Sequence, residues 1–139
     1  MSAKKHRIRI NEETWTYRLL PDAEYNELHG TDSQAITDLE ERTIDVAERG
    51  FNLNTMIHET FHAYKSYLCL DSAEMDNSAV EEIFASFFGK NSFKILEKAV
   101  NMYKNLVVLD NAEKESVKNF LKIAKRMDEL CNRNVKLLE

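Results

Sequence analysis

Apolar and polar side chains alternate with a period of two from residue 6 to residue 20, which is typical of strands. Residues 6–20 contain two such runs around the polar Asn11-Glu12-Glu13, and this arrangement predicts a β-hairpin. Residues 24–28 follow Pro21-Asp22 and are expected to form a helical turn. Residues 34–40 and 42–47 then predict two further strands, which should be neighbours in the sheet because the connection between them is short.

After Gly50 the apolar period lengthens to about 3.6, which predicts three helices. The first follows Asn52, an N-cap residue type, and its stripe comprises Leu53, Ile57, Phe61, Tyr64 and Leu68. The second begins near residues 76–78, and a kink is expected between Gly89 and Ser92. Its apolar face comprises Val80, Ile83, Phe84, Phe87, Phe88, Phe93, Leu96, Val100 and Tyr103. The third begins at Asp110 or Asn111, with Val117, Phe120, Leu121, Ala124, Met127 and Cys131 on one face.

These elements predict an α+β fold, in which a small antiparallel or mixed sheet is followed by three helices. A chain of 139 residues is long enough to bury one core, so we expect a single domain over residues 1–139. Residues 1–50 form its sheet-rich half, residues 51–109 carry the first two helices, and residues 110–139 form a C-terminal helical extension.

Charge and composition exclude several classes of function. The net charge is −5 and the basic residues are scattered along the sequence, so no nucleic-acid partner is expected. The chain has no apolar leader and no run of 18 apolar residues, so we expect no export, no membrane partner and a cytoplasmic location. Cys69 and Cys131 lie far apart, which gives no support to a cysteine cluster.

The segment His58-Glu59-Thr60-Phe61-His62 lies within the first predicted helix. Two histidines four residues apart lie on one helical face, so both imidazoles can bind one metal ion. Short ligand distances and a tetrahedral geometry favour Zn²⁺ as this ion. Glu59 lies about 100° further around the helix, beside the metal, where it can take a proton from the water that zinc activates. The spacing therefore predicts His58 and His62 as metal ligands and Glu59 as the catalytic base.

A catalytic zinc site usually has three protein ligands, and no third histidine follows His62. Carboxylates on the next predicted helix are the candidates. Glu81 borders the apolar face of that helix, whereas Glu82 points roughly the opposite way. We favour Glu81, with Glu82 as the alternative and Asp76 as a distant third.

Several segments together resemble the minimal gluzincin peptidases that are common in phage and prophage genomes. They are residues 17–22, 30–32, 42–46, 55–63 and 80–85, which contain Tyr-Arg-Leu-Leu-Pro-Asp, Gly-Thr-Asp, Arg-Thr-Ile-Asp-Val, Thr-Met-Ile-His-Glu-Thr-Phe-His-Ala and Val-Glu-Glu-Ile-Phe-Ala. The resemblance implies a zincin-like fold with the glutamate ligand just after an aliphatic residue on the second helix, which matches Glu81 after Val80. It also implies that residues 34–39 form an edge strand beside the cleft. The helix after Asp110 departs from the minimal pattern.

These observations predict a zinc-dependent peptidase that acts on a peptide or protein substrate. The competing hypothesis is a phage or prophage regulatory protein that keeps the zincin scaffold and binds a partner without general proteolysis. An intact Glu59 favours the peptidase, and the amphipathic C-terminal helix favours a binding role. The oligomeric state is left open. Tyr64 and Tyr67 are expected in the core, and His6 and His29 are expected at the surface with no role.

Overall fold

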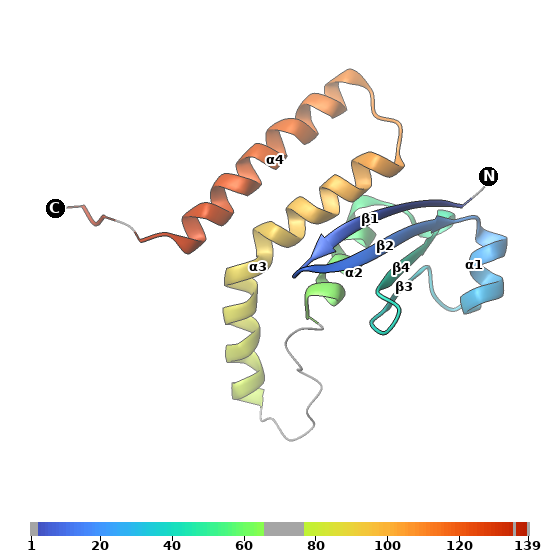
Figure 1. The fold of residues 1–139 in the computed structure, drawn as a ribbon, viewed down its shortest axis with the longest axis horizontal. Coiled ribbons are helices and arrows are strands. Elements are labelled where there is room, and N and C mark those ends of the chain that lie inside the picture. The colour runs from blue at the N-terminus through green and yellow to red at the C-terminus, as the bar shows by residue number, and fades with distance from the viewer. Residues whose placement is uncertain (1–2, 66–76, 135, 139) are drawn as a thin grey trace.

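The computed structural model describes residues 3–65, 77–134 and 136–138, which form a four-stranded sheet and four α-helices (Figure 1). The first half contains β1 (Lys4–Ile10), β2 (Glu13–Leu20), α1 (Asp22–His29), β3 (Ala35–Asp38), β4 (Thr43–Ala47) and the short 3-10 helix η1 (Glu48–Gly50). The second half contains α2 (Leu53–Lys65), α3 (Asn77–Leu106) and α4 (Asn111–Asn132). The predicted α+β class is confirmed, and none of the described helices is long and apolar enough to cross a membrane.

The sheet has the strand order β1-β2-β4-β3 and is mixed. The predicted hairpin is confirmed, since β1 and β2 pair antiparallel around Asn11 and Glu12, whose φ angles are 49° and 68°. Two successive positive φ values are the geometry of a two-residue turn that matches the twist of the strands it joins. β2 pairs parallel with β4, and β4 pairs antiparallel with β3. The segment expected at an edge therefore contains β3, which lies at one edge of this sheet.

Helix α2 begins as the sequence predicts but buries a different face. The Asn52 carboxamide oxygen accepts the backbone N–H of Thr55 at 2.8 Å, which confirms the N-cap. Met56, Thr60 and Ala63 are fully buried in the core. The predicted stripe through Ile57 and Phe61 is only partly buried, and Leu68 lies outside the described residues. Two partners cause this difference, because the sheet covers one side of α2 and α3 covers another.

Helix α3 packs against α2, α4 and β1, and α4 lies alongside its second half (Figure 1). The Phe61 ring of α2 contacts Phe84 and Phe87, with ring centroids 6.0 and 5.5 Å away. Phe88 was expected on this face, but its side chain is 61% exposed because α2 covers only one side of α3. Figure 1 shows α3 changing direction about midway along its length, the region in which the sequence predicts a kink.

Helix α4 begins at the predicted position, where the Asp110 side chain accepts the N–H of Glu113 at 2.8 Å. It runs back along α3, its main contact, on the side of α3 away from the sheet (Figure 1). Ala124 is its buried residue, whereas Met127 and Cys131, expected on the covered face, are exposed. A single helical neighbour covers only a narrow strip of α4, and this explains the exposure of the flanking apolar residues.

Candidate metal site

His58 and His62 lie one turn apart on the face of α2 that is turned away from the core. Thr60 lies at about 200° around the helix from His58 and is fully buried, so the histidines occupy the opposite side. The two Nε2 atoms are 3.1 Å apart, and the ring centroids are 4.8 Å apart. The His58 side chain is 66% exposed, so this pair of nitrogen atoms is accessible to a ligand.

Glu59 lies between the histidine face and the edge strand. Its side chain is only 9% exposed, and its Oε1 atom is 3.9 Å from His58 Nε2. The other carboxylate oxygen accepts a hydrogen bond of 2.5 Å from Thr37 Oγ1 on β3. A buried carboxylate needs such a donor, so Thr37 fixes the direction in which Glu59 points.

Thr37 is a site residue that the sequence does not reveal. It belongs to a four-residue strand and matches no motif, and it precedes Glu59 by 22 positions. Its hydroxyl also lies 3.3 Å from the Glu59 carbonyl oxygen. Only the packing of α2 beside β3 brings these groups together, so a sequence pattern could at most mark Thr37 as one of several polar strand residues.

Tyr17 and Thr60 fix the rotation of α2 relative to the sheet. Thr60 Oγ1 donates to the Met56 carbonyl at 2.6 Å, so the Tyr17 hydroxyl, 2.6 Å from Oγ1, acts as the donor in the second bond. Burial raises the pKa of Tyr17 well above its usual range. This buried bond keeps the Thr60 side chain in the core. Because His58 and His62 lie on the opposite side of the helix, the same bond keeps the histidines at the surface.

The donor set fits a divalent metal ion such as zinc. The candidate ligand atoms of His58, Glu59 and His62 all lie within 4.8 Å of one another. Two imidazole nitrogens bound tetrahedrally at 2.0–2.1 Å from zinc would be about 3.3 Å apart, close to the Nε2 separation here. The histidine pair is therefore already arranged for a shared ion.

The predicted third ligand, Glu81, is not part of this group. Glu81 is exposed near the start of α3, and among the described residues its carboxylate does not join His58, Glu59 and His62. Glu81 precedes Phe84 by three positions and so lies on the side of α3 that contacts α2. Glu82, also exposed, borders a small hollow together with Ile83, Phe87 and Lys90. Glu81 as a ligand stays a prediction, and Asp76 lies outside the described residues.

The other residues considered from the sequence have different positions. Tyr64 is buried in the core, as expected, and His6 is exposed. Tyr67 lies outside the described residues. The expectation for His29 is wrong, because its Nε2 atom is 2.7 Å from Asp45 Oδ2 and its side chain is only 21% exposed. The α1 helix, which extends to His29, places this ring over β4.

Comparison of the chain with protein-family models, curated proteins and solved structures finds no match in any of the three.

Proposed function

We propose that this protein is a zinc-dependent peptidase with Glu59 as its general base. The observation that carries the proposal is the convergence of the His58 and His62 Nε2 atoms, 3.1 Å apart, with the Glu59 carboxylate held beside them. The resemblance of the motif region to the phage-type gluzincins supports the same reading. A zincin-like arrangement of the sheet and the helices is part of this proposal.

In this mechanism His58 and His62 hold the metal together with the predicted ligand Glu81. Zinc, when bound, would polarise the peptide carbonyl and lower the pKa of the attacking water. Glu59 accepts the proton of that water and transfers it to the leaving amine. Thr37 is a positioning residue, since its hydrogen bond orients the Glu59 carboxylate.

The edge strand supplies a way to bind the substrate. In the described part of the chain β3 pairs only with β4, so its outer backbone groups can pair with an extended peptide. Thr37 belongs to this strand and contacts Glu59, so a peptide added along β3 would pass close to the general base. This arrangement favours an extended segment of a peptide or protein as the substrate.

The first test is the zinc content of the purified protein and its variants. We expect the wild-type protein to retain zinc after gentle dialysis, and His58→Ala and His62→Ala to lose it. Glu81→Gln and Glu82→Gln, compared in the same way, identify the third ligand, and we expect only the first to weaken zinc retention. A wild-type protein that binds no zinc even when zinc is supplied would contradict the proposal.

The second test is the cleavage of fluorescence-quenched peptide mixtures and of unfolded casein. Glu59→Gln is expected to retain zinc and to lose activity, by about a hundredfold or more if it removes general base catalysis. Thr37→Val should lower kcat with little change in KM. Equal cleavage by the wild-type and Glu59→Gln proteins would rule out the mechanism. Zinc retention without cleavage by either form would instead favour a scaffold that binds a partner without cutting it.

A further inference from the structure

Helices α3 and α4 enclose an open groove of about 620 Å³. Its α3 side consists of residues between Glu97 and Asn105. Neither histidine nor Glu59 lines the groove, so it is separate from the candidate metal site.

The rim of the groove is strongly basic, although the protein carries a net charge of −5. Five lysines line it, against the single acidic residue Glu97. They are Lys104, Lys114, Lys118, Lys122 and Lys125. In the described part of the chain, none of these five lysines lies within ion-pair distance of a carboxylate. Four of the five belong to α4, and the packing of α3 against α4 adds Lys104.

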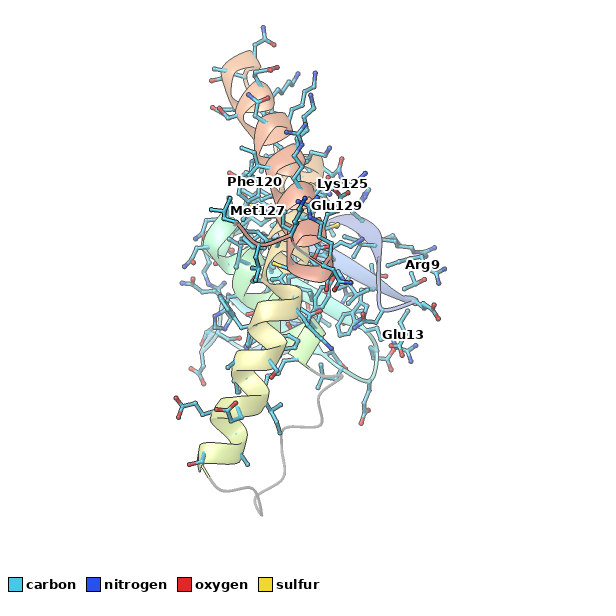
Figure 2. All side chains as sticks on the ribbon, turned by 90° about the vertical axis from the view of Figure 1, so that its left-hand side faces the viewer. Arg9, Glu13, Phe120, Lys125, Met127 and Glu129 are labelled. Atoms are coloured by element: carbon cyan, nitrogen blue, oxygen red, sulfur yellow. The ribbon has the colours of Figure 1, made fainter. Side chains whose placement is uncertain are left out.

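Four of these lysines form a row. Lys114, Lys118, Lys122 and Lys125 are spaced by four, four and three residues on α4, which places them along one side of the helix over about 16 Å. Figure 2 shows Lys125 on one side of α4 and Phe120 on the other. A row of this length fits an extended ligand with repeated negative charges better than a single compact anion.

The floor of the groove is apolar. It is formed by Val107 and Leu109 from the α3–α4 connection and by Val117 and Leu121 from α4. Single-stranded nucleic acids are usually held by aromatic stacking and arginine contacts, and the lining contains neither an aromatic residue nor an arginine. A lysine row above an aliphatic floor instead complements a helix with acidic residues on one side and leucine-like residues on the other.

We infer that the α3–α4 groove binds an acidic amphipathic peptide segment of a partner protein. The occupant places its carboxylates along the lysine row and its apolar side chains on the aliphatic floor. This inference does not depend on the proposed peptidase activity, because no residue of the metal site contributes to the groove.

The test measures binding of a fluorescein-labelled peptide of about 15 residues, enough to follow the lysine row as a helix. The peptide carries glutamates on one helical side and leucines on the other. We expect saturable binding that weakens with salt, and no binding of the same peptide with lysine in place of glutamate. Failure of the glutamate peptide to bind the wild-type protein would overturn the inference.

Variants that replace lysines of the groove by glutamate are compared with a charge-reversal variant outside the groove. Lys118→Glu combined with Lys122→Glu is expected to weaken binding by about tenfold or more, because two attractive contacts become repulsive. Arg126→Glu is the control on the same helix, since Arg126 is exposed and does not line the groove. It should change affinity by less than about twofold, and circular dichroism checks that each variant folds.

Other occupants give distinct results in the same assay. An oligo-dT strand or oleate that binds more tightly than the glutamate peptide and displaces it would overturn the inference in favour of a nucleic acid or a lipid. Self-association of the wild-type protein that the double lysine variant abolishes, measured by sedimentation, would assign the groove to a second copy. Equal losses of peptide affinity in the double variant and in Arg126→Glu would also contradict a site in the groove.

Discussion

Two clusters among the described residues combine histidine with a carboxylate, and their surroundings differ. In one cluster Asp45 on β4 binds Arg18 of β2 and His29 of α1. In the other, His58 and His62 of α2 lie beside Glu59. The first cluster is closed by its own partners. The second leaves its nitrogen atoms at the surface, and this difference in access separates a structural cluster from a candidate metal site.

In the closed cluster, the partners of Asp45 satisfy the hydrogen-bonding capacity of a carboxylate whose residue is only 1% exposed. Arg18 donates from Nε to Oδ1 at 2.6 Å and from its terminal nitrogen to Oδ2 at 2.5 Å. His29 Nε2 lies 2.7 Å from the same Oδ2. The hydrogen bond to Asp45 raises the pKa of Arg18 above its usual value. Both oxygens are therefore occupied, and the cluster joins α1 to the two central strands.

The open cluster uses the same residue types differently. His58 is 66% exposed, and each histidine has its Nε2 atom directed at the other rather than at a buried acceptor. Glu59 differs from the histidines, because its carboxylate accepts a hydrogen bond from Thr37 on the neighbouring strand β3. A histidine pair that does not stabilise the core can exchange its mutual contact for a metal ion at little structural cost.

The largest effect on stability is expected from Asp45→Ala. The change leaves the Arg18 guanidinium and the His29 ring without their common acceptor, and we expect a loss of about 3 kcal/mol in the free energy of unfolding. Urea unfolding followed by circular dichroism measures this loss. Asp32→Ala, at an exposed loop position, is the control and should stay within about 0.5 kcal/mol of wild type. Similar values for the two variants would show that the closed cluster does not stabilise the fold.

An intermediate effect is expected from Tyr17→Phe, which removes the buried bond to Thr60 and should cost about 1 kcal/mol. The raised pKa of Tyr17 also predicts a pH dependence. Its contribution is fully present below the ordinary value of 10.0 and is lost as the pH rises above it, because the folded state resists ionisation. The difference in unfolding free energy between wild type and Tyr17→Phe should therefore shrink above pH 10.0. A constant difference at all pH values would contradict this assignment.

The smallest effect on the metal-free protein is expected from His58→Ala and His62→Ala. In the presence of a chelator each should unfold within about 0.5 kcal/mol of wild type, since the pair is outside the core. His29→Ala is the matched control and should be less stable than both, because it loses the contact with Asp45. Added zinc should raise the melting temperature of wild type but not of the two α2 variants. Equal destabilisation by all three substitutions would remove the distinction between the clusters.

Much of the local structure could be predicted because it depends on neighbouring residues. Alternation before residue 21 predicts the β1–β2 hairpin, and Asn52 and Asp110 mark the starts of α2 and α4. The exposure of Phe88 and Met127 could not be predicted in this way. Phe88 and Met127 each belong to the apolar face of an amphipathic helix. How much of such a face is buried depends on how many other elements pack against the helix.

The sequence by itself determined the elements, the mixed α+β class and the spacing that puts His58 and His62 on one face of a helix, because all of these depend on short-range periodicity. Only the tertiary structure decided which polar residues have buried partners. Thr37 reaches Glu59 across 22 positions, Arg18 reaches Asp45 across 27, and Lys104 of α3 joins the lysine row of α4 around one groove. Such pairings depend on how strands and helices pack, and no local pattern specifies that packing.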